Sequence, residues 1–342
     1  MSKASRGDKP HPRNALNDLT GKQWLRFLRT WVVEEGLTQA DAERLEALAS
    51  RCWAEFVRDF DARADTPSPE AWAEFARSWF IADSRRYLEN RDVEMHPARY
   101  PEEMVEPFIL FFTKRGEWVL DPFVGSGATL VSCLETGRKG VGIELSPRYA
   151  AKCRQRLSER EGGSACFVIE GDARGIGQPE FWQRYAAQGL PFGDDGMPIF
   201  DFIMTSPPYW NMLRKSRGGV ISTHKARTQR GLDQHYSDDP ADLGNISDYA
   251  QFLEELGSIF DACARLLRPG RYLVVVAQNL RTPEGTICTL AWDLAQRIGR
   301  SLLFQGEKIW CQNSKFLGIW GYPKIFVPNY HHHYCLIFRR PD

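Results

Sequence analysis

In the second half of the chain, short apolar runs alternate with stretches in which apolar residues recur every three or four positions. Short apolar runs are typical of buried strands, and the longer periodicity is typical of helices. The expected strands cover 117–120, 139–145, 165–170, 200–205, 271–277, 302–310 and 334–338, and the expected helices include one ending at 136 and those over 147–160, 247–267 and 286–300. Strands separated by helices favour a parallel sheet that is covered on both faces. The pattern therefore predicts a doubly wound α/β fold.

The first part of the chain shows helical periodicity and no comparable series of strand-like runs. Apolar residues recur at helical spacing from about 17 to 90, with a proline-rich break at 66–69, after which a helix is expected over 70–88. We therefore expect a helical N-terminal region over 1–95 and an α/β domain over 96–342.

The composition is that of an ordinary globular protein, with 342 residues, 43% hydrophobic and 26% charged. No apolar run reaches the roughly 18 residues of a membrane span, and no apolar stretch follows the basic N-terminus as in a secretory signal. The eight cysteines show no CxxC pair or metal-like spacing, so we expect buried thiols in the cytoplasm. The run from His331 to His333 does not predict a metal site, because adjacent strand residues face opposite sides.

A glycine turn follows the strand expected at 117–120; its sequence is Asp121-Pro122-Phe123-Val124-Gly125-Ser126-Gly127-Ala128-Thr129. Glycines at 125 and 127 let the backbone approach a ligand where a side chain would block it. The turn lacks the third glycine of the dinucleotide pattern GxGxxG. Acids follow the next two strands: Glu144, where a carboxylate can accept the hydroxyls of a ribose, and Asp172, where an adenine is expected. This order predicts a site for a nucleotide-type cofactor.

A second motif, Thr205-Ser206-Pro207-Pro208-Tyr209-Trp210, follows the strand expected at 200–205. Parallel sheets bind ligands at this edge. The two prolines hold the chain extended and have no N–H, so neighbouring carbonyls and the Ser206 hydroxyl can accept hydrogen bonds from an amino group. Tyr209 can stack on a base, which contributes roughly 1–3 kcal/mol. Accepting the amino hydrogens frees a delocalised lone pair for attack on a methyl donor, so Ser206, Pro207, Pro208 and Tyr209 are the predicted catalytic residues.

These motifs resemble those of the amino-methylating DNA methyltransferases over roughly 90–340, in the order that puts the cofactor block before the catalytic tetrad. The segment His96-Pro97-Ala98-Arg99-Tyr100-Pro101 looks like the family block that lines the methionine end of the cofactor. Tyr322-Pro323, Phe326 and Asn329-Tyr330-His331 look like the closing segment of the family. Together the motifs and the resemblance assign cofactor binding to His96, Pro101, Asp121, Pro122, Phe123, Gly125, Gly127, Thr129, Glu144, Asp172 and Thr205.

The resemblance implies a Rossmann-like sheet of seven strands with the last one antiparallel, S-adenosylmethionine as cofactor and double-stranded DNA as substrate. It also implies a target base flipped out of the duplex, at a cost of a few kcal/mol. In this family a leading serine in the tetrad is associated mainly with cytosine N4, and aspartate more often with adenine N6. A cognate restriction or defence partner is compatible with this interpretation.

The region that recognises the DNA sequence is harder to identify. Relatives in which the cofactor block precedes the tetrad usually carry a recognition region after the tetrad, and few residues follow the final strand here. One candidate is a basic insert at about 211–244; the other is the helical N-terminal region. The insert contains six cations, Arg214, Lys215, Arg217, Lys225, Arg227 and Arg230. Basic, glycine-bearing loops can track phosphates, so we expect these residues and Trp210 to contact DNA. A surface loop without this role accounts for the insert equally well.

Four other functions remain open from the sequence. The methyl acceptor can be adenine N6 in DNA, an RNA base, or the side-chain amide of a protein glutamine, which also fits a polar-Pro-Pro-Tyr motif. A non-catalytic DNA-binding subunit that kept the fold would bind no cofactor. The Ser-Pro-Pro-Tyr-Trp form and the basic insert favour transfer to the N4 amino group of cytosine in DNA.

Overall fold

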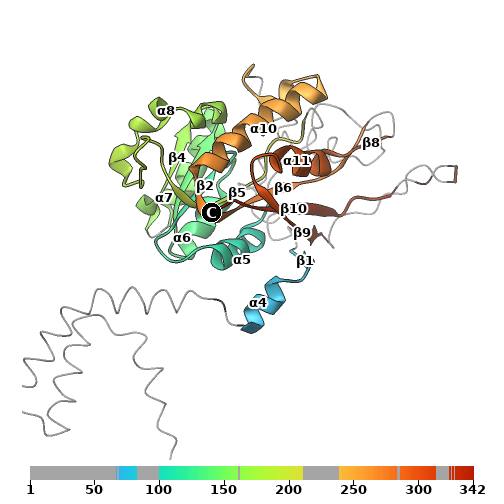
Figure 1. Ribbon diagram of the computed structural model, residues 1–342, viewed down its shortest axis with the longest axis horizontal. Helices are drawn as coiled ribbons and strands as arrows, with labels where there is room; N and C mark the ends of the chain where they lie inside the picture. The colour runs from blue at the N-terminus through green and yellow to red at the C-terminus, as the bar shows by residue number, and fades with distance from the viewer. Residues whose placement is uncertain are drawn as a thin grey trace, which may run out of the picture. The chain divides into compact units, whose positions relative to one another are not determined.

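Figure 1 shows a computed structural model of the chain. It describes residues 67, 69–82, 100–160, 162–210, 239–282, 286–312, 323–324, 326 and 328–342. All of them belong to the second of two compact units, Asp65–Asp342. The helices expected before residue 66 lie outside the described residues.

The described residues form one eight-stranded sheet in the order β1-β9-β10-β6-β5-β2-β3-β4. Its strands are β1 Trp79–Ile81, β2 Trp118–Asp121, β3 Lys139–Glu144, β4 Cys166–Glu170, β5 Phe200–Thr205, β6 Leu267–Ala277, β9 Leu303–Cys311 and β10 His332–Arg339. A separate hairpin pairs β7 Leu280–Arg281 with β8 Ile287–Cys288. All pairings in the large sheet are parallel except those of β10, which runs antiparallel between β6 and β9. The predicted α/β class is confirmed, as are the seven expected strands and the antiparallel direction of the last one.

The eighth strand, β1, was not expected. It pairs in parallel with β9 at the edge of the sheet, in the register Trp79↔Ile309. The prediction of one helix over 70–88 is therefore wrong at this strand, because α4 ends at Phe75. Three residues are too few for the period of a strand to stand out, and pairing with β9 decides their conformation. Although β1 lies before residue 96, it shares the sheet of the predicted α/β domain.

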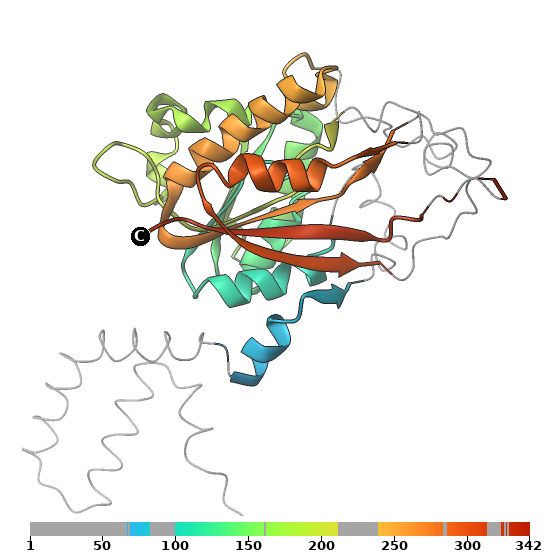
Figure 2. The same ribbon diagram turned by 45° about the vertical axis from the view of Figure 1, so that its right-hand side comes forward.

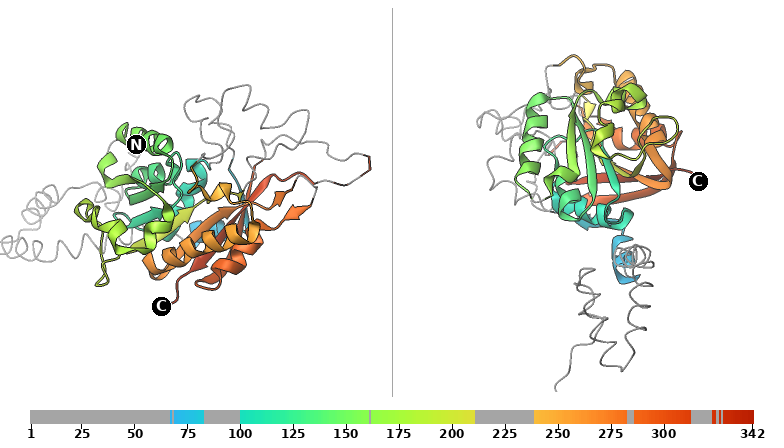
Figure 3. Two further views of the ribbon diagram at one scale, coloured as in Figure 1. Left: turned by 90° about the horizontal axis from the view of Figure 1, so that it is seen from above. Right: turned by 90° about the vertical axis from the view of Figure 1, so that its left-hand side faces the viewer.

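Helices cover both faces of the sheet (Figures 2 and 3). The helices are α4 Pro69–Phe75, α5 Glu102–Phe112, α6 Ala128–Glu135, α7 Pro147–Ser158, α8 Pro179–Gln183, α10 Tyr249–Leu266 and α11 Leu290–Ile298, with 3-10 turns η3 Gly163–Ala165, η4 Ala173–Gly177, η5 Ala186–Gln188 and η7 Leu243–Asn245. One core layer packs α5, α6 and α7 on the sheet through residues such as Phe108, and the other packs α8, α10 and α11 through residues such as Phe260. Burying a side chain of this size contributes about 1.5–3 kcal/mol. None of the helices in the described segments has the length and apolar character of a membrane span.

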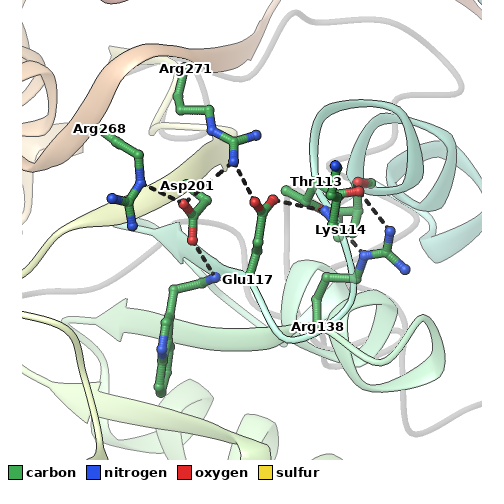
Figure 4. Close-up of polar contacts among 9 residues, drawn as sticks. Thr113, Lys114, Glu117, Arg138, Asp201, Arg268 and Arg271 are labelled. Carbon is green, nitrogen blue, oxygen red and sulfur yellow. Dashed lines mark hydrogen bonds and ion pairs between the residues drawn. The ribbon is translucent and has the colours of Figure 1, made fainter. Parts of the chain in front are cut away.

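Charged residues fix the amino-terminal ends of the central strands (Figure 4). The buried carboxylate of Asp201, in β5, accepts hydrogen bonds from the Trp118 backbone N–H at 3.1 Å and from Arg268 Nε at 2.9 Å. Arg271 of β6 pairs with Glu117, and Glu117 also accepts a hydrogen bond from the Lys114 backbone N–H at 2.8 Å. This network joins β2, β5 and β6 at the sheet edge opposite their carboxyl ends.

Candidate active site

The predicted site residues follow the carboxyl ends of neighbouring parallel strands. β2 ends at Asp121, β3 at Glu144 and β5 at Thr205, and β2 pairs with both β3 and β5. The ends of adjacent parallel strands meet at one edge of a sheet, where open α/β folds bind their ligands. The glycine turn and the catalytic tetrad therefore start side by side.

Asp121 joins the two motifs through hydrogen bonds. Its carboxylate is buried and accepts from Thr129 Oγ1 at 2.5 Å, Thr205 Oγ1 at 2.6 Å, Tyr100 OH at 3.0 Å and the Phe123 N–H at 3.0 Å. Burial raises the pKa of Asp121, and the hydrogen bonds oppose that shift. Thr129 and Thr205 therefore both donate their hydroxyl hydrogens to Asp121. These bonds give the three residues a positioning role, and their direct contact with the cofactor stays a prediction.

The glycine turn takes a conformation that favours glycine. Gly125 has φ 52° and Gly127 has φ 90°, both in the left-handed region. A Cβ on Gly127 would lie 2.3 Å from Cys153 Sγ of α7, so a larger residue would also clash. The turn is held to the neighbouring strand by a hydrogen bond of 3.0 Å from the Val124 N–H to the Ile143 carbonyl. Helix α6 begins directly after the turn, at Ala128.

Glu144 faces this turn from the end of β3. Its Oε2 accepts from the Gly125 N–H and its Oε1 from the Ser146 N–H, both at 2.9 Å. Burial raises the pKa of Glu144 to about 7, and the negative charges of Asp121 and Asp242 add to the shift. Each carboxylate oxygen has a second lone pair, so the side chain can still accept hydrogen bonds from ribose hydroxyls.

Asp172 follows β4 and caps the 3-10 turn η4, accepting a hydrogen bond of 2.9 Å from the Arg174 N–H. Its carboxylate also lies 3.6 Å from the Arg174 guanidinium, which in turn lies 3.5 Å from Glu255. Asp172 is thus a cap at the expected position after β4, and its interaction with an adenine stays a prediction.

In the tetrad, two hydroxyls and one carbonyl form a compact cluster. Ser206 Oγ and Tyr209 OH both donate to the Val276 carbonyl at 3.2 Å, and they lie 3.1 Å from each other. Burial raises the pKa of the Tyr209 phenol well above its ordinary value, so the hydroxyl keeps its proton. Pro207 is buried, whereas Ser206, Pro208 and Tyr209 are half-buried. The residues after β5 are thereby tied to the end of β6.

Trp210, expected to contact DNA, is held within the protein. Its indole N–H donates to the Ile246 carbonyl at 3.0 Å, and its ring packs edge-on against Tyr249 at 5.1 Å between centroids. Its φ of 48° is unusual for a non-glycine residue. These contacts fix the chain after the tetrad, and a contact of Trp210 with DNA stays a prediction.

Some of the other predicted residues are described by the structure, and the others lie outside the described residues. Pro101 is buried and precedes α5, and Phe123 is half-buried with its ring 6.4 Å from that of Phe260. His96, Tyr322 and all six cations of the insert lie outside the described residues, and their roles stay predictions. Within the described segments, no group of three or more His, Cys, Asp or Glu could hold a metal ion.

Sequence reasoning gave no separate role to Tyr100, although it lies inside the quoted block before the turn. Its buried hydroxyl contacts both Asp121 and Thr129 Oγ1, the latter at 2.6 Å. Its partners are 21 and 29 residues away in the chain, so no local spacing marks the contact. A tyrosine next to a proline in a predicted cofactor block was the available signal.

The chain is similar to known methylases. The family described as DNA methylase matches residues 19–155. The type II methyltransferase M.Cfr9I of Citrobacter freundii is 48% identical over 62 residues, which are 18% of this chain and 21% of that protein. The type II methyltransferase M2.DpnII of Streptococcus pneumoniae is 45% identical over 62 residues, which are 18% of this chain and 23% of that protein. The matches therefore span less than a quarter of the length of these relatives.

Solved structures resemble the chain at low sequence identity. The N-methyltransferase NodS of Bradyrhizobium japonicum, in complex with S-adenosyl-L-homocysteine, aligns with a TM-score of 0.40 and 13% identity over 75% of this chain and 96% of that chain. TrmN of Thermus thermophilus aligns with a TM-score of 0.37 and 14% identity over 66% of this chain and 44% of that chain.

The sheet order, with one antiparallel strand next to a parallel series, and the motifs at its carboxyl edge define a Rossmann-like α/β domain. The match of residues 19–155 to the family described as DNA methylase and the two type II methyltransferase relatives support, over part of the chain, the resemblance to the amino-methylating DNA methyltransferases.

The cofactor implied by the motifs and the resemblance is S-adenosylmethionine, and the residues present fit it. The left-handed turn at Gly125 and Gly127 brings backbone rather than side chains to the edge of the sheet. Glu144 lies against that turn with acceptor capacity for ribose hydroxyls. When bound, the cofactor would supply an electrophilic methyl group on a sulfonium.

Proposed function

We propose that the protein transfers a methyl group from S-adenosylmethionine to the exocyclic N4 amino group of a cytosine in double-stranded DNA. One observation carries the proposal. Thr205, directly before the tetrad, donates a hydrogen bond to Asp121, the first residue of the glycine turn. The shared buried carboxylate keeps the two motifs at one edge of the sheet, so two bound reactants can be held in line for transfer.

In this proposal Ser206 accepts a hydrogen bond from the substrate amino group. A serine hydroxyl can donate or accept, but here its proton is directed to the Val276 carbonyl. The lone pairs of Oγ are then available to the N4 amino hydrogens. Accepting one of them localises the nitrogen lone pair, which can attack the methyl group. A hydroxyl is too weak a base to keep the proton that the methylated nitrogen then loses, so that proton passes to water.

Pro207 and Pro208 keep the chain extended after Ser206 and remove two N–H donors from the acceptor side. Tyr209 supplies the ring on which the flipped base stacks. Its hydroxyl is bound to the Val276 carbonyl, which anchors the tip of the ring. These features support an aromatic amino group as the methyl acceptor.

The leading serine of the tetrad supports cytosine rather than adenine as the target base. Mass spectrometry of nucleosides, after incubation of unmethylated DNA with the protein and methyl-labelled cofactor, tests the choice. We expect labelled N4-methylcytosine, and none with Ser206→Ala run in parallel. Labelled N6-methyladenine alone would overturn the cytosine assignment.

The same experiment addresses the other functions when RNA and protein extracts are offered as acceptors. Label in RNA or in glutamine, with none in DNA, would replace DNA as the substrate. A non-catalytic DNA-binding subunit is tested by calorimetric titration with S-adenosylmethionine, where absence of binding would favour it. We place the protein in the cytoplasm, where a cognate restriction enzyme would be its partner. Protection of host DNA from cleavage by that enzyme is the corresponding test.

A further inference from the structure

An aromatic row connects the closing strands of the sheet to the catalytic tetrad. Trp310 of β9 and His333 of β10 are paired across the two strands, and their rings stack with centroids 4.7 Å apart and planes 27° apart. The next ring is that of Tyr209, whose centroid lies 6.2 Å from that of His333 with planes 38° apart. His333 thus lies between a buried indole and the tyrosine of the tetrad.

The direction of β10 explains why a histidine near its start reaches this edge of the sheet. β10 runs antiparallel to β6, and Tyr334 pairs with Ala277, the last residue of β6. The first residues of β10 therefore lie beside the ends of the parallel strands, where the tetrad begins. His333 and the buried Cys335 share one face of the strand, and His332 is on the other face, where its ring lies 5.2 Å from that of Tyr334.

The row is anchored at its far end by the unexpected strand β1. Trp310 is 1% exposed, and its indole N–H donates to the carbonyl of Ala82 at 2.7 Å. Ala82 follows β1 directly and donates its own N–H to the Cys311 carbonyl at 3.4 Å. The position of Trp310, and through it that of His333, therefore depends on the pairing of β1 with β9.

Tyr209 needs such support because its hydrogen bonds leave one motion free. The bonds of its hydroxyl to the Val276 carbonyl and to Ser206 fix the tip of the side chain. They do not fix the plane of the ring, which can still turn about the axis through that tip. A flat neighbour beside the ring limits this rotation.

We propose that His333 is a positioning residue: supported by Trp310 and β1, its ring fixes the plane of Tyr209 on which the target base stacks. The proposal rests on the proposed function for the role of Tyr209, but the contact itself exists without DNA. It gives one histidine of the triplet a specific place in the site and leaves its neighbour His332 as a matched control.

The test uses the full-length protein with His333→Ala, His333→Phe and His332→Ala. We expect His333→Ala to lower kcat for methyl transfer to DNA roughly 10- to 100-fold, since small misplacements have effects of that size. Binding of S-adenosylmethionine, measured by calorimetry, is expected to stay unchanged. His333→Phe restores most of the turnover because it restores a flat ring, and His332→Ala keeps the wild-type rate.

A second measurement does not depend on catalysis. With 3-fluorotyrosine at position 209, the ¹⁹F resonance is expected to shift in His333→Ala and to stay in place in His332→Ala. Should His333→Ala fail to fold, His333→Leu takes its place, because it fills similar space without a flat ring.

Three results would overturn the proposal: an unshifted resonance in His333→Ala, equal losses of turnover in His333→Phe and His333→Ala, or an equal loss in His332→Ala. A wild-type protein that methylates no DNA would refute the proposed function instead. The fluorine measurement would then still decide whether His333 positions Tyr209.

Discussion

The backbone N–H of Gly125 donates a hydrogen bond of 2.9 Å to Oε2 of Glu144, which joins the glycine turn after β2 to the acid at the end of β3. Because Glu144 is also shielded from water, its pKa rises to about 7. The acid proposed to hold the ribose therefore titrates near neutral pH, and this gives cofactor binding a pH dependence.

Ribose hydroxyls donate to the ionised carboxylate, so cofactor binding favours loss of the Glu144 proton. We expect the affinity for S-adenosylmethionine to rise as the pH increases through about 7 and to level off above it. Glu144→Gln should weaken binding roughly 10- to 100-fold at pH 8, as loss of a charged hydrogen bond predicts, and remove the dependence on pH. Calorimetric titrations between pH 6 and about 8.5 measure both effects. An equally steep pH profile in Glu144→Gln would show that another group is responsible.

The raised pKa of Glu144 also makes the stability of the cofactor-free protein depend on pH. Stability falls as the pH rises, whereas the affinity for the cofactor increases. A carboxyl whose pKa is higher in the folded state than in the unfolded chain favours folding most below its unfolded value of 4.5, and this contribution is lost as the pH rises to about 7. Wild type should therefore lose more stability than Glu144→Gln between these two pH values. Urea denaturation of both proteins across this range checks the expectation.

Among the polar residues of the site, substitution of Asp121 is expected to lower the free energy of unfolding the most. Asp121→Ala leaves the hydroxyls of Tyr100, Thr129 and Thr205 without their buried acceptor, which should cost about 3 kcal/mol or more. Thr205→Val, the matched control, removes one of these bonds and should cost about 1 kcal/mol. Denaturation curves in urea measure both values. Similar losses in the two variants would contradict the role of Asp121 as a common acceptor.

The sequence predicted the parts of this site that are local in the chain. The glycine turn, Glu144 and the tetrad each occupy a few consecutive positions, and apolar runs mark the strands before them. The bond between Asp121 and Thr205 spans 84 residues, so no spacing rule indicates it. Strand β1 was not predicted, because three residues are too few to show the alternation of apolar and polar positions that marks a strand.

Trp210 shows why side-chain roles are harder to predict than motifs. An exposed tryptophan after the tetrad would be a natural stacking surface for DNA, and the sequence contains nothing against it. Its indole N–H partner, the Ile246 carbonyl, lies 36 residues further along the chain and becomes a neighbour only in the folded protein. The local pattern therefore identifies the motif but not the tertiary contacts of its last residue, whose contact with DNA stays a prediction.

Tyr209 should affect turnover far more than cofactor affinity. Tyr209→Ala removes the stacking surface, which contributes roughly 1–3 kcal/mol, so we expect kcat to fall about 10- to 100-fold with calorimetric binding of S-adenosylmethionine unchanged. Tyr209→Phe keeps the ring and loses only the hydroxyl bonded to the Val276 carbonyl, so a loss of about fivefold is expected. Comparable losses in both variants would mean that the hydroxyl, not the ring, is what the reaction needs.

Gly127 and Cys153 are expected to be energetically coupled. Gly127→Ala places a Cβ 2.3 Å from Cys153 Sγ at a φ of 90°, and the clash and the strain together should cost about 2–4 kcal/mol. Cys153→Ala removes the clash but not the strain, so the double variant should recover about 1 kcal/mol or more relative to additivity. A double-mutant cycle of unfolding free energies measures this coupling. Strict additivity would show that the backbone conformation alone requires glycine.

The basic insert is predicted to contact DNA phosphates, although its six cations lie outside the described residues. Each neutralised phosphate contributes a slope of about −0.9 to the dependence of log affinity on log salt concentration.

Replacing Arg214, Lys215 and Arg217 by glutamine should therefore flatten the slope by about 2–3 units if each contacts one phosphate. Lys114→Gln with Arg115→Gln serves as the control, because both residues are exposed and shortly precede β2 in the chain, and Lys114 lies beside Glu117 at the amino-terminal edge of the sheet. Fluorescence anisotropy with a labelled duplex at several salt concentrations measures the slopes. An unchanged slope in the triple variant would exclude the insert as a phosphate-binding segment and leave the N-terminal region as the remaining candidate.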